Sequence, residues 1–199
     1  MIYLFAFLTF LITPSNDAQS FQNLNFESAL VPATTPTGFG QDVSISDGLP
    51  GWKGSLAGNE VGTILHNNFT LGSLAISVLG PQWGVQNGII EGNYTVALIG
   101  ARGSNAGDAL ISQIGTVPID AQSILFKASP GVGQLEVTFR GSQIAIIPLT
   151  TTSGYTIYGG DISSSAGQSG NIRSHLINGT APKCLLYEGS VLYSSHGWI

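Results

Sequence analysis

The chain has 199 residues, of which 43% are hydrophobic and only 9% are charged, and 6 basic against 11 acidic residues give it a formal net charge of −5. Because Lys and Arg form no cluster and no basic amphipathic segment, the sequence excludes nucleic acid and an anionic membrane surface as partners. The single cysteine, Cys184, excludes an intramolecular disulfide and a cysteine-rich zinc site.

The chain begins with an apolar run over residues 2–12 that only Thr9 interrupts. This run is shorter than the ~20 residues that a membrane span needs. Pro14 ends it, and Ala18 and Ser20 place small residues where a signal peptidase reads. We therefore expect residues 1–20 to be a secretory signal peptide and the protein to be secreted or at the cell surface. The alternative is a buried first strand or helix, because no Lys or Arg precedes the run.

The remainder is typical of short strands separated by turns rich in Gly, Asn and Ser. Leu24 and Phe26 alternate with polar neighbours, and Val43 and Ile45 do the same. Further short segments rich in β-branched and aromatic residues predict strands at 61–65, 74–79, 94–99, 110–114, 124–128, 135–139, 144–149 and 155–158. The spacing leaves no room for crossover helices, which favours antiparallel pairing. The sequence predicts an all-β, antiparallel two-sheet β-sandwich, specifically a jelly roll, with at most one helical turn at 163–168.

Two blocks carry a family resemblance. The first is the stretch 23–27 (Asn-Leu-Asn-Phe-Glu) followed by Gly51-Trp52, and the second is the stretch 155–173 (Tyr-x-x-Tyr-x-x-Asp-Ile-Ser-x-x-Ala-Gly-Gln-x-Gly-x-Ile-Arg). Together they resemble the galactose-binding-like jelly rolls of uncharacterised secreted bacterial proteins, of the kind that often carry a PEP-CTERM sorting tail. The resemblance implies a domain over residues 21–173, with a self-bonded turn at Asp161 and Ser163 and positive φ angles at Gly167 and Gly170.

The chain departs from this family after Arg173. Family members continue with a closing strand that contains an Asp-Asp sequence, whereas residues 174–199 contain neither that sequence nor a sorting tail. We therefore interpret 174–199 as an atypical tail that is out of frame or truncated. This interpretation predicts a sandwich that lacks its closing strand and has an unpaired edge.

A calcium ion is one expectation from the resemblance. In such jelly rolls an ion often ties the N-terminal region to the last strand, and Glu27, with Asn25 beside it, matches the family position. The partner acids of the closing strand are missing, and a hard cation needs six to eight oxygen ligands. The alternative is that Glu27 is a solvated strand residue.

Carbohydrate binding is the leading functional expectation. A pyranose stacks on an exposed aromatic ring that has amides at its edge. The candidate rings and amides are Trp52, Trp83, Tyr94 and Tyr158 with Asn67, Gln82, Gln86 and Asn87. Trp83 lies in a Pro-Gln-Trp-Gly loop, so the predicted site is Trp83, Tyr94, Gln82 and Asn87, whereas Trp52 is predicted to fill the core.

Catalysis has weaker support. His66 stands alone, because the sequence contains no Gly-x-Ser-x-Gly motif that would supply a nucleophilic serine. A carboxylate pair for glycoside hydrolysis could come only from the acids Glu60, Glu91, Asp108 and Glu136. We expect a secreted non-enzymatic protein that binds extracellular polysaccharide. The alternatives are a purely structural envelope or matrix protein without a ligand pocket, and a glycoside hydrolase-like enzyme.

Overall fold

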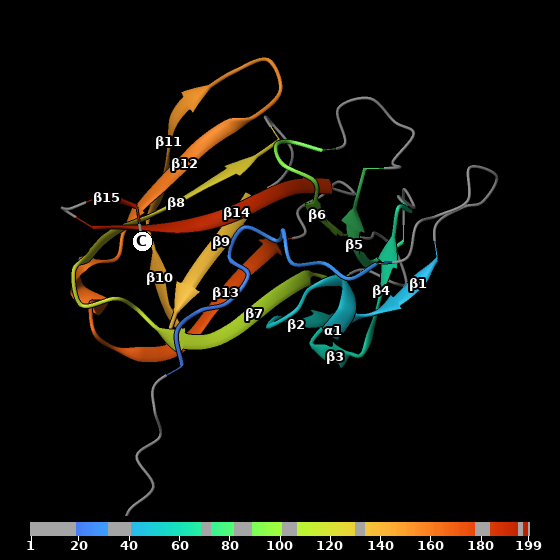
Figure 1. Cartoon of the computed structure of the whole chain (residues 1–199), viewed down its shortest axis with the longest axis horizontal. Helices are drawn as coiled ribbons and strands as arrows, with labels where there is room; N and C mark the ends of the chain where they lie inside the picture. The colour runs from blue at the N-terminus through green and yellow to red at the C-terminus, as the bar shows by residue number, and fades with distance from the viewer. Residues whose placement is uncertain are drawn as a thin grey trace, which may run out of the picture.

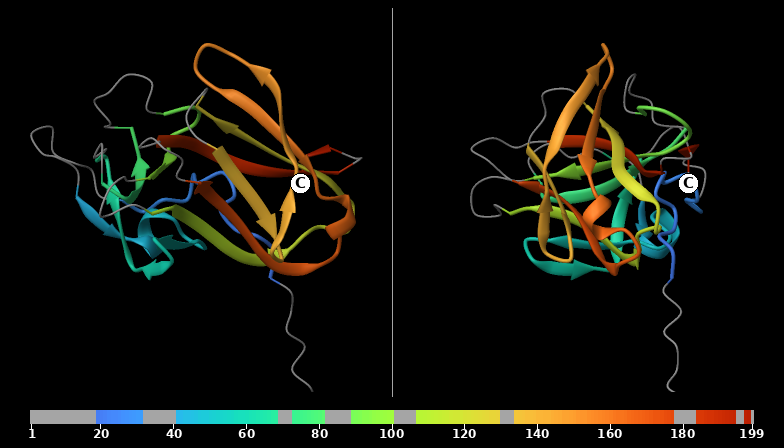
Figure 2. Two further views of the ribbon diagram at one scale, coloured as in Figure 1. Left: turned by 180° about the vertical axis from the view of Figure 1, so that it is seen from behind. Right: turned by 90° about the vertical axis from the view of Figure 1, so that its left-hand side faces the viewer.

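The computed structural model of this chain describes residues 19–31, 41–68, 73–81, 89–100, 107–129, 134–177, 184–194 and 197–198. Strands dominate the described residues, and they form two sheets that pack face to face (Figures 1 and 2). The predicted leader lies outside the described residues except for Gln19 and Ser20. No helix of the described part is long and apolar enough to cross a membrane.

The larger sheet has nine strands among the described residues. Its order is β1-β4-β5-β6-β14-β8-β12-β11, and β15 pairs with β14. The bounds are β1 (Asp42–Ser44), β4 (Thr63–His66), β5 (Ala75–Leu79), β6 (Thr95–Ile99), β14 (Cys184–Ser194), β8 (Ala121–Ala128), β12 (Thr156–Asp161), β11 (Ile146–Thr151) and β15 (Gly197–Trp198). The β11–β12 hairpin projects beyond the body of the sandwich in every view (Figures 1 and 2).

The smaller sheet has six strands among the described residues, in the order β10-β9-β13-β7-β2-β3. The bounds are β10 (Ser142–Ile144), β9 (Gln134–Phe139), β13 (Ser169–Ile177), β7 (Ala109–Thr116), β2 (Lys53–Leu56) and β3 (Asn59–Val61). The named strand pairs of both sheets are antiparallel, apart from the parallel pair β4–β5. The predicted fold class, an all-β antiparallel β-sandwich, is confirmed.

The core follows from alternation along the strands. On β8 the side chains of Ile124, Phe126 and Ala128 are buried, because every second residue of a strand faces the same side. On β13, Ile172 and Leu176 face the core in the same way. Burial of these apolar side chains supplies the main stabilisation of the sandwich. A second buried cluster, made of Ala75, Leu79, Ala97 and Ile99, covers the opposite face of β5 and β6.

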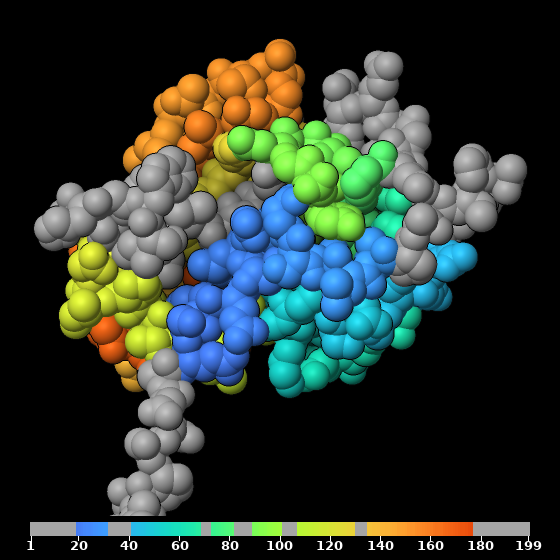
Figure 3. Space-filling model, viewed as in Figure 1, coloured from blue at the N-terminus to red at the C-terminus, as the bar shows by residue number. Residues whose placement is uncertain are grey.

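The N-terminal segment 19–31 lies across one side of the sandwich (Figure 3). The strand expected at Leu24 and Phe26 is wrong, because Asn23 and Phe26 have positive φ angles of 49° and 61° and the segment turns. This turn inserts the Phe26 ring into the core, 5.5 Å from the ring centroid of Trp52. The Trp52 indole N–H donates to the carbonyl of Asn23 at 3.0 Å. The prediction that Trp52 fills the core is confirmed.

The expected strand at 43–45 is shorter than predicted. It ends at Ser44, where the single-turn helix α1 (Ile45–Gly48) begins. The Ser44 hydroxyl accepts a hydrogen bond from the backbone N–H of Asp47 and thereby caps this turn.

The block 155–173 folds largely as the resemblance implies. Asp161 accepts a 2.8 Å hydrogen bond from the backbone N–H of Ser163, and the side chain and backbone of Ser163 lower the pKa of that carboxyl. The 3₁₀ turn η2 (Ser163–Ser165) follows, and Gly167 has a φ angle of 72°. The expectation for Gly170 is wrong, because this residue lies in β13 with no positive φ. It is instead a close-approach position where a Cβ would meet the Arg140 side chain.

The closing strand is present. β14 (Cys184–Ser194) pairs with β6 on one side and with β8 on the other, so the expectation of a missing strand and an unpaired edge at this place is wrong. The segment 184–194 contains the runs Leu-Leu-Tyr and Val-Leu-Tyr, and such aliphatic and aromatic residues favour a strand without the Asp-Asp sequence of the family. An out-of-frame or truncated origin of residues 174–199 stays a prediction.

Candidate functional site

The predicted sugar-binding residues are only partly described. Gln82, Trp83 and Asn87 lie outside the described residues. Tyr94, which directly precedes β6, is half-buried, and a Cβ on Gly80 would come 3.0 Å from its ring. A sugar contact at these residues stays a prediction.

The Glu27 carboxylate is held by amide groups. It accepts hydrogen bonds from the backbone N–H of Asn93 at 2.9 Å, from the Asn93 side-chain amide at 2.9 Å and from the backbone N–H of Tyr94 at 3.1 Å. The Asn25 side chain accepts from the Glu27 backbone N–H at 3.3 Å. In the described part of the chain no group of three His, Cys, Asp or Glu side chains is placed to hold a metal ion. Amide donors around Glu27 do not fit a cation, and the calcium ion stays a prediction.

Two of the four acids considered for hydrolysis, Asp108 and Glu136, lie beside the same residue, His175, and the other two pair with lysines. Glu60 pairs with Lys53, Glu91 with Lys127, and Asp108 with His175 at 2.9 Å. Glu136 lies directly opposite His175 on the neighbouring strand. Asp108 and Glu136 therefore lie near each other with His175 between them, and glycoside hydrolysis stays a prediction.

His66 is a core residue. Only 2% of it is exposed, its Nδ1 atom has no hydrogen-bond partner in the described structure, and burial lowers the pKa of its imidazole. This position does not suit a general base, which must reach a substrate.

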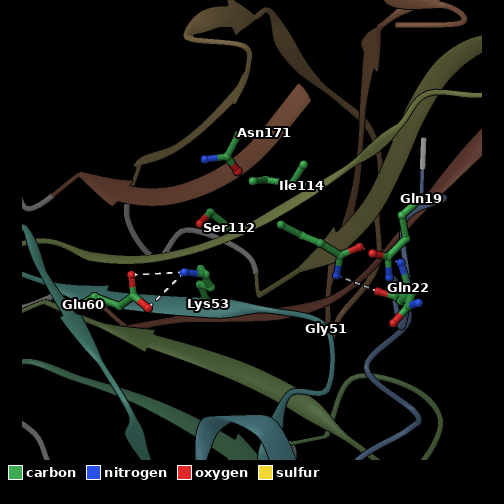
Figure 4. Close-up of a pocket in the computed structure, with 9 residues that line it drawn as sticks. Gln19, Gln22, Gly51, Lys53, Glu60, Ser112, Ile114 and Asn171 are labelled. Atoms are coloured by element: carbon green, nitrogen blue, oxygen red, sulfur yellow. Dashed lines mark hydrogen bonds and ion pairs between the residues drawn. The ribbon is translucent and has the colours of Figure 1, made fainter. Parts of the chain in front are cut away.

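The described structure has a cavity of about 440 Å³ beside the six-stranded sheet (Figure 4). This volume lies within the ~300–1,000 Å³ of typical small-ligand sites. We call it the Asn171 pocket. It is lined by Gln19, Gln22, Gly51, Lys53, Glu60, Ser112, Gln113, Ile114 and Asn171.

The pocket forms because two segments border the same side of β7. Strand β2 pairs with the first half of β7, with Lys53 opposite Ser112. The N-terminal segment lies beside the second half of β7. There Ser20 forms a β-bridge with Thr116, and the Thr116 N–H donates to the carbonyl of Gln19 at 2.9 Å. The pocket lies where β2 ends and the N-terminal segment begins.

Gln113 fixes the width of this gap. Its side-chain amide donates to the carbonyl of Gln22 at 2.8 Å, and its side-chain oxygen accepts from the Gln22 N–H. Gly51 has a φ angle of 85°, and a Cβ there would come 3.1 Å from the Gln113 amide nitrogen. A glycine is therefore required where the chain enters β2.

The floor of the pocket combines an apolar and a polar side chain. Ile114 on β7 is 69% exposed, and Asn171 on β13 lies directly opposite it. The Asn171 Oδ1 atom is buried and has no hydrogen-bond partner in the described structure. A buried acceptor without a partner costs free energy, and a ligand hydroxyl would satisfy it.

The charged residues of the pocket neutralise each other. Among the nine lining residues only Lys53 and Glu60 are charged, and their ion pair has an Nζ–Oε1 distance of 3.2 Å. The remaining polar groups are amides and one hydroxyl, which both donate and accept hydrogen bonds.

Sequence reasoning did not find this site. The alternation of Asn171, Arg173 and His175 with Ile172, Ser174 and Leu176 marks one polar face of β13, and this signal was available. The gap itself depends on contacts between residues 91 positions apart, such as Gln22 and Gln113, for which no local pattern exists.

No family model matches the chain, and no curated protein matches it. Among solved structures, the chain is similar to one titled "Structure of TmCBM61 in complex with beta-1,4-galactotriose". The sequence identity is 13% and the TM-score is 0.48, and the match covers 89% of this chain and 100% of the other.

Proposed function

We propose that this protein is a secreted, non-catalytic β-sandwich that binds extracellular polysaccharide, and that the Asn171 pocket contacts the sugar. The observation that carries the proposal is the buried Asn171 Oδ1 atom without a partner, at the floor of a cavity lined by amide and hydroxyl groups.

The balance of charge in the pocket favours a carbohydrate over a small ion. The charges of Lys53 and Glu60 cancel, so the pocket walls offer hydrogen bonds without a net charge. A polyhydroxylated ligand matches such walls, because each sugar hydroxyl both donates and accepts.

Ile114 adds an apolar contact. Its 69% exposed side chain stands opposite Asn171, so a sugar ring on this floor places its C–H face on Ile114 and its hydroxyl edge toward Asn171. Binding sites for small ligands commonly combine such an apolar wall with a few polar groups.

Affinity gel electrophoresis with a panel of neutral and acidic polysaccharides tests the proposal. We expect at least one polymer to retard the wild-type protein, and the variant Asn171→Ala to be retarded less. Gln122→Ala is the matched control, because it removes an exposed amide from β8 in the other sheet.

Equal retardation of the wild type and Asn171→Ala would show that the pocket is not the site. If no polymer retards the wild type, the protein is better described as a structural envelope or matrix protein. Release of reducing sugar from any polymer would favour the hydrolase alternative.

A further inference from the structure

Arg173 lies at the border of the Asn171 pocket. It follows Asn171 by two positions on β13, so both side chains leave the same face of the strand. Its cross-strand partner on β7 is Ser112, which lines the pocket. Side chains at such paired positions have Cβ atoms about 5 Å apart.

Arg173 differs from the other described cations in having no partner among the side chains that the structure describes. Lys53 pairs with Glu60, Lys127 with Glu91, and the Arg140 guanidinium donates to the Gln168 side chain at 2.7 Å. Arg173 is exposed, and no described side chain forms a hydrogen bond or ion pair with it.

The neighbours of Arg173 along its row are hydroxyl residues. Ser112 lies on one side and Thr138 of β9 on the other. Two acids lie in the next row: Glu136 is opposite His175 on β9, and Asp108, which directly precedes β7, forms an ion pair with His175. The Arg173 guanidinium and the hydroxyls of Ser112 and Thr138 can all donate hydrogen bonds, and this row contains no negative charge. Such a set of donors suits an oxyanion.

Building on the proposed function, we propose that Arg173 is a subsite for an oxyanion carried by the glycan, so that the protein prefers acidic over neutral polysaccharides. A sugar in the Asn171 pocket that continues along the sheet face toward Ser112 brings the next unit to Arg173. A carboxylate or a sulfate ester on that unit accepts from the guanidinium.

The net charge of −5 opposes this preference, and the two acids beside His175 lie one row away from Arg173. At physiological ionic strength the Debye length is ~8 Å, so distant acidic residues are largely screened, whereas a direct contact with Arg173 is not. The local pairing therefore decides the selectivity.

The test uses two pairs of polymers that differ in charge. Polygalacturonate is compared with its methyl-esterified form, which probes a carboxylate, and dextran sulfate is compared with dextran, which probes a sulfate ester. Affinity electrophoresis is run on the full-length wild type, Arg173→Gln, Asn171→Ala and the control Arg140→Gln, which removes an equal charge from an arginine that already has a partner. Circular dichroism verifies that each variant is folded.

We expect the wild type to prefer the charged member of at least one pair by about fivefold in apparent affinity, as a partly exposed charge-assisted contact would give. Arg173→Gln should abolish that preference, whereas Arg140→Gln should retain it. Asn171→Ala should weaken binding to both members of the pair.

Other outcomes separate the two proposals. Equal binding of charged and uncharged polymers, or a preference that survives in Arg173→Gln, overturns the oxyanion subsite, and the proposed function stands if Asn171→Ala still weakens both. No retardation of the wild type by any polymer overturns the proposed function and the subsite together.

Discussion

At the scale of single residues, we assign one polar side chain, Asn171, to ligand binding and another, Glu27, to stability. Asn171 keeps an acceptor without a partner, which we attribute to a ligand. Glu27 accepts hydrogen bonds from Asn93 and Tyr94, which joins the N-terminal segment to the residues before β6.

Replacing Glu27 by Gln should lower the free energy of unfolding by about 1 kcal/mol, because a side-chain amide turns one acceptor into a donor that faces the Asn93 amides. Urea unfolding measures the change. Glu60→Gln is the control, since its exposed ion pair with Lys53 contributes little. Equal losses in the two variants would contradict a specific role for Glu27.

The same Glu27 variant tests the calcium prediction. An ion that binds the folded state raises the melting temperature as its concentration rises. If calcium binds at Glu27, CaCl₂ should stabilise the wild type and leave Glu27→Gln unchanged. A melting temperature of the wild type that does not respond to CaCl₂ would remove the ion from this site.

His66 makes stability depend on pH. Burial lowers the pKa of its imidazole below the ordinary value of 6.5, so the unfolded chain takes up a proton below about pH 6.5 that the folded chain does not bind. The free energy of unfolding should therefore fall as the pH drops below about 6.5. We expect a smaller fall in His66→Gln, measured by urea unfolding at about pH 7 and pH 5. Parallel curves for the two proteins would contradict this.

At the scale of elements, β14 decides whether the C-terminal residues belong to the sandwich. It lies between β6 and β8 near the middle of the nine-stranded sheet, with residues 184–187 paired to β6 and residues 187–194 paired to β8, so it is paired along its whole length. Hydrogen exchange followed by mass spectrometry should show peptides from 184–194 protected as strongly as peptides from β8. Rapid exchange of 184–194 alone would show that the tail is not part of the sandwich.

Much of the strand set could be predicted from the sequence, because alternation and flanking turns are local. The strands predicted at 74–79, 94–99, 124–128 and 135–139 correspond to β5, β6, β8 and β9, although β8 begins three residues earlier. The segment 24–27 has the same alternation but turns, because Phe26 is buried against Trp52, a contact between residues distant in sequence. The family motif does not predict β14, because 184–194 lacks its Asp-Asp sequence, although the local composition of this segment favours a strand.

The candidate site could not be predicted from motifs. Its polar face along β13 follows from alternation, but its position depends on where β2 ends and the N-terminal segment begins beside β7. Gln113 and Gln22, which hold that gap, belong to no recognisable pattern. The aromatic site predicted around Trp83 stays untested, because Gln82, Trp83 and Asn87 lie outside the described residues.

At the scale of the whole molecule, each sheet buries an apolar face against the other sheet. The opposite face of the six-stranded sheet carries amides, hydroxyls, paired charges and the exposed Arg173. The predicted leader at 1–20 agrees with a partner outside the cell. Cleavage after Ser20 would remove Gln19 from the pocket wall, together with the contacts that Gln19 and Ser20 make to Thr116. The mass of the mature N-terminus decides whether Gln19 is retained.

The most direct measurement is a ¹⁵N–¹H NMR titration with an oligosaccharide from the polymer that retards the wild type most. The largest shift changes should fall on Ser112 to Ile114, on Asn171 to Arg173 and on the Asn171 side-chain amide. Changes confined to residues 82–94, with Asn171 and its neighbours unmoved, would contradict the placement of the sugar on the six-stranded sheet.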